Sequence, residues 1–383
     1  MNCYTNTLSL YIHIPFCLKK CRYCDFYSVP FNTELAQRYT SALVREWELI
    51  KKTLPSEPKI TTIFMGGGTP SLLGKNDWIF LKERLFSKLD LSSLKEWTVE
   101  VNPETFCEEK AYLWAENGVN RLTFGVQSLN ERELSICGRT HSAKKASEVL
   151  NNCTLNIFKS IGVDVIFGLP GQGIDSLKDS LALILENSKV KHLSAYELTI
   201  NENTPFGRHR KFLPLPEEKV LIEMHSLVSN VCNDFNFQQY EISNYSLSGY
   251  QSCHNLAYWD HKPYIGLGCS AHSYIHPNRW ANIEDITGYL NSIDSGKPAI
   301  EYQEEICKKE LSTELIYLGL RKNIGLDEKR YLELTGQDFY NDVRKAKLEK
   351  FVSDGLLIYS LNRYWCLTDK GRIVSNRVVG ELI

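Results

Sequence analysis

Residues 11–24 read Tyr11-Ile-His-Ile-Pro-Phe-Cys17-Leu-Lys-Lys-Cys21-Arg-Tyr-Cys24 and join an apolar, strand-like run to a loop with three cysteines. Three thiolates in such a short loop can hold three irons of a [4Fe-4S] cube. Ordinary electron-transfer clusters use four cysteines, so this CxxxCxxC spacing leaves one iron open to a ligand from outside the protein. We therefore predict Cys17, Cys21 and Cys24 as the ligands of a metal-binding, iron–sulfur loop.

A zinc site and scattered structural cysteines are the alternatives for this loop. A structural zinc needs a fourth nitrogen or sulfur ligand, commonly from a second CxxC pair. No second CxxC occurs in the sequence, and only Cys3 could supply a ligand locally. A disulfide framework is not expected in a chain of 383 residues without a secretory signal. These considerations favour the iron–sulfur cluster.

Length and composition restrict the class of protein. A chain of 383 residues exceeds one average domain, and its 43% hydrophobic residues can form real cores. The net charge of −2 gives no basic footprint for nucleic acid. We see no signal peptide and no run of about 18 apolar residues, so we expect no membrane insertion. Twelve cysteines without a secretory signal predict a reducing, cytoplasmic location.

The first 200 residues alternate short apolar runs with longer amphipathic stretches. The predicted strands span residues 8–14, 60–65, 97–101, 121–126, 162–167 and 192–198. The predicted helices between them span residues 33–52, 75–89, 108–117, 143–152 and 176–187. Such alternation is typical of an α/β fold with a parallel sheet and right-handed crossovers. About six such units suit a partial (β/α)6 TIM-like barrel, whose chemistry lies at the carboxyl ends of the strands.

Polar and glycine-rich segments follow these predicted strands. Residues 66–70 read Gly-Gly-Gly-Thr-Pro, and consecutive glycines allow backbone to approach a ligand closely. Glu100, Gln127 and Asp164 lie at or near the ends of later strands, and Arg139 follows on a connection. A single carboxylate at a strand end is as often part of a structural salt bridge as part of a functional site. Recurrence at five strand ends favours one polar site.

Six strings occur in one order along the chain: YIHIPFCxxxCxYC, GGGTP, EVNPE, FGVQS, GRTH and DVIFGLPGQ. Together they resemble the branch of the radical S-adenosylmethionine (SAM) superfamily that contains the coproporphyrinogen dehydrogenases (HemN) and the HemW proteins. The resemblance covers residues 8–300 and implies that SAM binds the open iron through its amino and carboxylate groups. It also implies a place in porphyrin metabolism.

The resemblance implies a role for each matching residue around the cluster and SAM. Those that would flank the cluster or hold the methionine moiety are Tyr11, Tyr23, Gly67, Gly68 and Thr69. Those that would bind polar groups of SAM or reach its nucleoside are Glu100, Arg139, Gln127 and Asp164. Those that would close the adenosine pocket are Leu198 and, in the segment GLGCSAHS, His272.

Two features separate the two kinds of protein in this branch. The dehydrogenases that resemble this chain carry a further cysteine directly after the triplet, where Asp25-Phe26 stands here. Residues 253–259 read Cys253-His254-Asn255-Leu-Ala-Tyr258-Trp259 and resemble the HNxxYW motif typical of HemW proteins. HemW proteins are heme chaperones, so the resemblance implies heme and heme-acceptor apoproteins as partners. The histidine of the motif, His254, is the suspected heme contact.

The chemistry of this motif allows two interpretations. Imidazole is a common axial ligand of heme iron, and Tyr258 and Trp259 offer flat faces for a porphyrin. Cys253 adds a thiol. The alternative is that His254 and Asn255 form hydrogen bonds within a buried loop. No CxxCH motif for covalent heme attachment is present, so heme ligation by His254 rests on the resemblance.

Beyond residue 300 the pattern changes to helices followed by a hairpin. Helices are predicted at residues 310–320, 327–335 and 337–353, a hairpin at 355–368 and a closing helix at 369–376. This order resembles a winged-helix domain, which the family uses as a lid or docking surface, and fold alone does not imply DNA binding. We expect three parts: a barrel at residues 1–200, a barrel-completing region at 201–300, and a mostly helical domain at 301–383.

The sequence leaves two functions in competition. The first is a heme chaperone in which the cluster and SAM regulate heme binding or release. The second is an oxygen-independent coproporphyrinogen III dehydrogenase, in which a 5′-deoxyadenosyl radical initiates oxidative decarboxylation to protoporphyrinogen IX. Asp25-Phe26 and the HNxxYW motif favour the chaperone. An electron donor for the cluster is implied as a further partner, while enzymatic turnover and homodimer formation are left open.

Overall fold

The computed structural model describes residues 6–383, so Cys3 lies outside the described part of the chain. The strands of its largest sheet are β1 (Thr7–Ile14), β4 (Lys59–Gly67), β5 (Glu96–Val101), β6 (Arg121–Gln127), β7 (Ser160–Phe167), β8 (Val190–Glu197), β9 (Gln238–Gln239), β10 (Asn244–Ser246), β11 (Tyr264–Leu267), β12 (His272–Ile275), β13 (Asn278–Asn282) and β14 (Ile300–Glu305). A short parallel pair, β2 (Phe16–Cys17) and β3 (Val29–Pro30), stands apart from this sheet.

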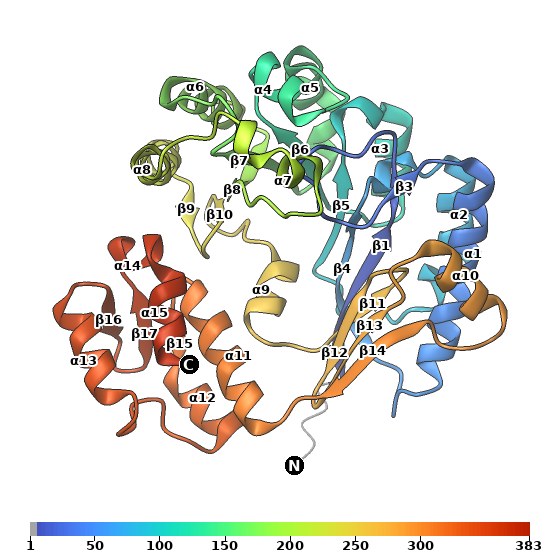
Figure 1. The fold of residues 1–383 in the computed structure, drawn as a ribbon. Coiled ribbons are helices and arrows are strands. Elements are labelled where there is room, and N and C mark those ends of the chain that lie inside the picture. The colour runs from blue at the N-terminus through green and yellow to red at the C-terminus, as the bar shows by residue number, and fades with distance from the viewer. Residues whose placement is uncertain (1–5) are drawn as a thin grey trace.

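The 12 strands follow the order β14-β13-β12-β11-β1-β4-β5-β6-β7-β8-β10-β9 (Figure 1). The neighbours from β11 through β1 to β8 run parallel. At one end β12, β13 and β14 form an antiparallel meander, and at the other β10 and β9 are antiparallel. The terminal strands β14 and β9 do not pair with each other, so the barrel is open.

This arrangement confirms the predicted α/β fold with a partial TIM-like barrel. The six predicted strands are β1, β4, β5, β6, β7 and β8. The sequence did not reveal β11, which pairs in parallel with β1 over residues 264–267, nor the antiparallel strands beyond it. These additional strands are short and are separated by turns, so they carry little local periodicity.

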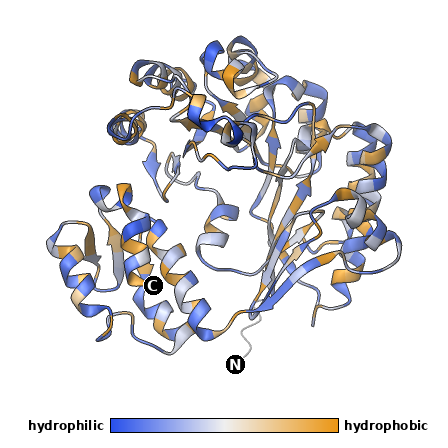
Figure 2. Ribbon diagram, viewed as in Figure 1, coloured by the Kyte–Doolittle hydropathy of each residue, from blue (hydrophilic) through white to orange (hydrophobic). Residues whose placement is uncertain are grey.

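The helices of this part are α1 (Thr33–Lys51), α2 (Lys75–Arg84), α3 (Glu108–Glu116), α4 (Glu131–Cys137), α5 (Ala143–Asn151), α6 (Ile174–Leu185), α7 (Pro205–Arg208), α8 (Glu218–Asp234), α9 (Cys253–Trp259) and α10 (Ile286–Asp294). α1 shows why they form: the Asn32 side chain accepts a hydrogen bond from Leu35 N at 2.9 Å and caps the first turn. Apolar residues spaced three or four apart, among them Tyr39, Leu43 and Trp47, are buried against the sheet. Figure 2 shows the mixed apolar and polar colouring of such amphipathic helices.

The carboxyl-terminal part contains α11 (Lys308–Arg321), β15 (Leu326–Asp327), α12 (Glu328–Thr335), α13 (Lys345–Ser353), β16 (Leu357–Ser360), β17 (Tyr364–Leu367), α14 (Asp369–Ile373) and α15 (Ser375–Leu382). The order of helices and the small sheet β15-β17-β16 match the predicted winged-helix-like arrangement. α13 begins later than residue 337, because Asn341 accepts a hydrogen bond from Arg344 N and forms a local turn. The single closing helix that we predicted is divided into α14 and α15.

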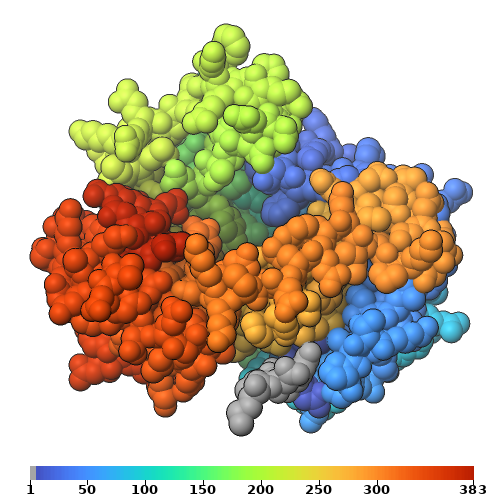
Figure 3. All heavy atoms as spheres, turned by 60° about the horizontal axis from the view of Figure 1, so that its bottom comes forward, coloured from blue at the N-terminus to red at the C-terminus, as the bar shows by residue number. Residues whose placement is uncertain are grey.

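Two large hydrophobic cores and a small cluster of Cys137, Ile166, Leu169 and Phe206 hold the described part of the chain together. The larger core lies between the parallel sheet and its helices, and the smaller one lies within the carboxyl-terminal helices. Tyr274 of β12 belongs to the smaller core, and α9 packs against both β4 and α11, so the two parts are in contact. Figure 3 shows a hollow between the red carboxyl-terminal helices and the yellow-green segment near residues 200–235. None of the helices within residues 6–383 is long and apolar enough to cross a bilayer.

Candidate functional site

A cavity of about 480 Å³ lies at the carboxyl ends of β1 and of β4 to β8. The residues that line it include most of the predicted site: Cys17, Cys21, Tyr23, Cys24, Gly67, Gly68, Thr69, Glu100, Gln127, Arg139, Asp164 and Leu198. Parallel strands bring their carboxyl ends to one edge of the sheet, which explains how segments far apart in sequence meet here. We call this space the strand-end cavity.

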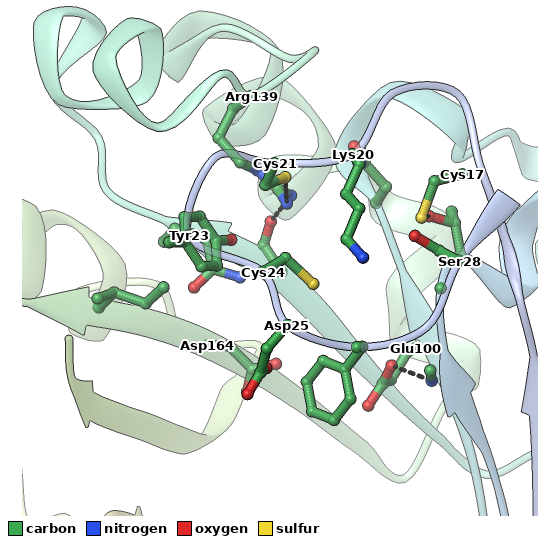
Figure 4. Close-up of a pocket in the computed structure, with 18 of the residues that line it drawn as sticks. Cys17, Lys20, Cys21, Tyr23, Cys24, Asp25, Ser28, Glu100, Arg139 and Asp164 are labelled. Carbon is green, nitrogen blue, oxygen red and sulfur yellow. Dashed lines mark hydrogen bonds between the residues drawn. The ribbon is translucent and has the colours of Figure 1, made fainter. Parts of the chain in front are cut away.

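The cysteine loop forms one wall of the strand-end cavity (Figure 4). Its two ends are joined because Cys17 lies in β2, which pairs with β3. Its middle is anchored by a hydrogen bond from Arg22 N to Cys137 O at 2.9 Å and by Arg139 Nη1, 3.3 Å from Cys21 Sγ. The middle of the loop is therefore held by one backbone hydrogen bond and by one side-chain contact to the Cys21 thiol.

The three thiols of this loop are not gathered around a single point. Within residues 6–383, no group of three His, Cys, Asp or Glu side chains is close enough to share one metal ion. The ligands of a mononuclear zinc site all bond the same ion. A four-iron cube places each thiolate on a different iron and therefore accepts more widely separated ligands.

The glycine run at the end of β4 forms a second wall. Gly67 has φ 103°, a left-handed conformation that favours glycine, and its N–H donates to Glu100 Oε2 at 3.2 Å. A Cβ on Gly68 would come within 2.7 Å of Phe16 O and 2.8 Å of Ile14 O. The glycines therefore allow β4 to run directly beside the start of the cysteine loop.

Two largely buried carboxyl groups face the interior of the strand-end cavity. Burial, together with the nearby Asp164, raises the pKa of Glu100 from 4.5 to about 8. Burial also raises the pKa of Asp164 from 3.8 to about 6. Each carboxylate would be stabilised by a positively charged group, so this side of the cavity favours a cationic ligand.

Two further buried atoms in the cavity lack a hydrogen-bond partner among the described residues. They are Gln127 Oε1 and Arg139 Nε, an acceptor and a donor. Gln127 has φ 71° at an irregularity of the β6–β7 pairing, and this strained position directs it differently from a regular strand residue. Unpaired buried polar atoms are costly, so they indicate a polar ligand that completes them.

Tyr11 and His272 line a different space. This second cavity, of about 630 Å³, lies between β1, β11, β12 and the helices α9 and α11, and we call it the interdomain cavity. Tyr258, Tyr264 and Tyr274 form much of its wall. Phe26, the second residue after Cys24, lines both cavities. The predicted adenosine contact at His272 is thus not placed beside Leu198.

His254 lies in neither cavity, although we predicted it as a heme contact. Its side chain is 1% exposed, and its ring nitrogens are hydrogen-bonded to Thr62 Oγ1 at 2.8 Å and to Tyr258 Oη at 2.9 Å. Burial lowers the pKa of His254 from 6.5 to about 3. In this conformation the imidazole has no nitrogen free for iron, which agrees with the alternative interpretation of the motif.

Several residues of the two cavities were missed by the sequence prediction. In the strand-end cavity these are Lys20, Thr123, Tyr196 and Glu197. Tyr196 and Glu197 could have been found, because they end the sixth predicted strand. The interdomain cavity as a whole was not predicted, since it depends on the pairing of β11 with β1 and on the position of α11.

Comparisons with known proteins agree with this geometry. Residues 11–184 match the radical SAM superfamily, and residues 306–374 match the HemN C-terminal domain. The chain is 34% identical over 380 residues to the heme chaperone HemW of Bacillus subtilis, covering 98% of this chain and 99% of that protein. It is 31% identical to heme chaperone HemW of Escherichia coli over 377 residues, covering 97% of each chain.

The chain belongs to the HemW family of radical SAM proteins. A solved structure of coproporphyrinogen III oxidase (HemN) from Escherichia coli, a radical SAM enzyme, superimposes with a TM-score of 0.83. That match covers 98% of this chain and 89% of the other at 21% identity, which shows a common fold. This chain and HemN therefore share one fold, which includes the open barrel and the carboxyl-terminal part.

Membership of the radical SAM superfamily implies a four-iron cluster and SAM, and the strand-end cavity fits both. The cysteine loop offers three thiolates and leaves one iron for SAM. SAM carries a positive charge on its sulfonium group, which suits the raised pKa values of Glu100 and Asp164. Its carboxylate and nucleoside offer partners for the unpaired atoms of Arg139 and Gln127.

Proposed function

We propose that this protein is a heme chaperone that binds heme and passes it to acceptor apoproteins. The observation that carries the proposal is the full-length similarity to proteins named heme chaperone HemW, at 34% and 31% identity. The chain keeps the two sequence features that distinguish this family from the dehydrogenases, namely Asp25-Phe26 after the cysteine triplet and the HNxxYW motif at residues 254–259.

In this proposal the two cavities have different roles. The strand-end cavity holds the cluster and SAM, which together can supply one-electron reductive cleavage of SAM when both are bound. Tyr23 and the glycine run shape the approach to the cluster, Glu100 and Asp164 stabilise positive charge, and Arg139 holds Cys21. An electron donor in the cytoplasm reduces the cluster, and acceptor apoproteins take the heme.

A coproporphyrinogen III dehydrogenase is the second candidate. The observation in its favour is the common fold with HemN of Escherichia coli, which extends over 98% of this chain. Both functions would use the same three cysteines and the same residues for SAM in the strand-end cavity, so the cavity alone does not separate them. The absence of a cysteine at residues 25 and 26 opposes the dehydrogenase.

Two assays on anaerobically reconstituted protein separate the functions. In the first, protein is incubated with coproporphyrinogen III, SAM and a reductant, and we expect no protoporphyrinogen. In the second, protein loaded with one equivalent of heme is mixed with an apo-hemoprotein, and we expect heme to move to the acceptor, visible in its absorption spectrum. Clear protoporphyrinogen formation, or a failure to bind heme, would overturn the proposal.

A further inference from the structure

The interdomain cavity has an aromatic wall built from three different elements. Tyr258 of α9 contacts Tyr264 of β11 edge to face, with ring centroids 4.6 Å apart. The ring centroids of Tyr264 and of Tyr274, which lies on β12, are 6.4 Å apart. Tyr317 of α11 and Phe26 of the cysteine loop also line the cavity. Its volume of about 630 Å³ and its ring-rich walls suit a flat, largely apolar ligand.

The charged groups of this cavity lie at its border with α11. Arg279 is held by Glu304 at 2.6 Å and by Glu314 at 2.8 Å, so its charge is already balanced. Among residues 6–383, the side chain of Lys262 forms one ion pair, with Asp260 at 3.2 Å, and it is 55% exposed. An exposed ion pair of this kind is weak, so Lys262 can turn to a carboxylate of a bound ligand at little cost.

Three histidines line the cavity, and two of them are already engaged. His13 is hydrogen-bonded to Tyr11 Oη at 3.0 Å and to Tyr27 O at 3.3 Å. His261 Nε2 is 2.7 Å from Glu314 Oε2. His272 forms no side-chain hydrogen bond within residues 6–383, although it lines the same wall as Tyr274. Burial and the neighbouring Arg279 lower the pKa of His272, which favours the neutral imidazole that binds metals.

We propose that heme binds in the interdomain cavity, with its porphyrin against the tyrosine wall and the imidazole of His272 as an axial ligand of the iron. A propionate group reaches Lys262 at the border of the cavity. This assignment rests on the proposed function, since it names the seat of the heme that the chaperone carries. The interdomain cavity contains the tyrosine wall, Lys262 and His272 together.

The same assignment explains what the HNxxYW motif does. His254 is a positioning residue: its ring is fixed by Thr62 and its Nε2 is hydrogen-bonded to the hydroxyl of Tyr258, which lines the cavity. The backbone of the motif is also fixed, because Glu96 accepts hydrogen bonds from Cys253 N and His254 N at 3.0 Å each. The motif thus fixes the position of Tyr258, which forms part of the wall of the proposed heme site.

The experiment compares the full-length wild-type protein with His272→Ala, His254→Ala and a control, His209→Ala, whose exposed ring lies outside both cavities. Each is titrated with hemin, and the axial ligand is identified by absorption and electron paramagnetic resonance spectra. We expect His272→Ala to lose the imidazole signature and to bind about tenfold more weakly. Added imidazole should restore the signature. His254→Ala and His209→Ala should both keep it.

A second variant tests the proposed heme site independently of the axial histidine. Leu318→Trp adds a large ring from α11 into the interdomain cavity and should reduce hemin binding while leaving the cluster intact. If His272→Ala and Leu318→Trp both bind hemin like the wild type, or if only His254→Ala loses the imidazole signature, this seat is wrong and the chaperone proposal stands. If the wild type binds no hemin, the proposed function itself fails.

Discussion

The strand-end cavity and the interdomain cavity differ in how their walls are made. The first is lined by residues at the ends of consecutive parallel strands, each of which follows a short apolar run in the sequence. The second is assembled from a late strand, an antiparallel meander and helix α11 of the carboxyl-terminal part. The first contains carboxyl groups and polar atoms without a partner among the described residues, whereas the second is lined mainly by aromatic rings and has its charges paired. The polar cavity that we assign to SAM and the aromatic cavity that we propose for heme therefore share Phe26 in their walls.

The strongest test of this separation removes one ligand of the cluster. Cys21→Ala should abolish the cluster, seen as loss of iron and of the sulfur-to-iron charge-transfer absorbance. Hemin binding at the interdomain cavity should persist, since none of its lining residues is a predicted cluster ligand. Cys107→Ala, which replaces an exposed cysteine before α3, is the control. A Cys21→Ala protein with a full complement of four irons would contradict the cluster assignment.

The next largest effect concerns the glycine wall. Gly68→Ala places a Cβ within 3 Å of the backbone at Ile14 and Phe16, and backbone atoms there cannot move aside easily. We expect a loss of about 2–3 kcal/mol in the free energy of unfolding, measured by urea denaturation. Gly173→Ala is the matched control, because nothing lies within 4 Å of its added Cβ. Equal stability of the two variants would show that the close approach of β4 to the cysteine loop is not required.

A smaller effect should appear in the pH dependence of stability. A carboxyl group whose pKa is raised on folding destabilises the folded state as it ionises, so stability is lost between the ordinary pKa of 4.5 and about 8. Without SAM, Glu100→Gln should therefore be more stable than the wild type by about 1–2 kcal/mol at pH 8, with little difference near pH 5. Asp164 is retained in both proteins, and the variant also loses the repulsion between this residue and Glu100.

Denaturation curves at several pH values, with and without SAM, check this prediction. Glu109→Gln, on the exposed surface of α3, serves as the control. Bound SAM should reduce the gain of Glu100→Gln, because a cationic ligand stabilises the ionised carboxylate. A gap between variant and wild type that does not change with pH would show that Glu100 is not forced to ionise in a buried position.

The smallest effect lies behind the interdomain cavity. Tyr258→Phe removes the partner of His254 Nε2 and should cost about 1 kcal/mol of stability. Hemin should bind with the same axial signature, since the ring of residue 258 remains in the wall. Loss of the histidine signature in Tyr258→Phe would instead mean that the motif supplies the ligand. Tyr196→Phe, in the strand-end cavity, is a control that leaves this wall unchanged.

Most of the strand-end cavity could be predicted because its information is local. Each strand is a short apolar run, and the residue that follows it faces the cavity, as with Glu100 and Asp164. The spacing of the three cysteines by itself indicates an iron–sulfur cluster. The helix α4 and the turn at residues 338–344 were missed, because short polar segments form them through side-chain caps such as Asn130 and Asn341.

The interdomain cavity could not be predicted because it depends on contacts between distant segments. β11 joins β1 across about 250 residues of sequence, and this pairing places Tyr264 beside Tyr11 and His272. His254 shows the same limit: the motif indicates a histidine near a tyrosine and a tryptophan, and only the fold shows that Thr62 of β4 takes one ring nitrogen. The sequence identified the residues of the motif, whereas the structure shows where they lie relative to the barrel.

The open barrel also leaves a free sheet edge at β14, and its sequence bears on how copies of this protein behave at high concentration. The strand reads Ile300-Glu-Tyr-Gln-Glu-Glu305, and most of its side chains are exposed. An unpaired edge is a template for adding the strand of another molecule. Here, however, a second copy would bring Glu301 and Glu305 against the same residues of the first, whereas Glu304 is already paired with Arg279. Like-charge repulsion therefore protects the exposed edge from fibre-like growth, and any dimer of this protein is expected to use another surface.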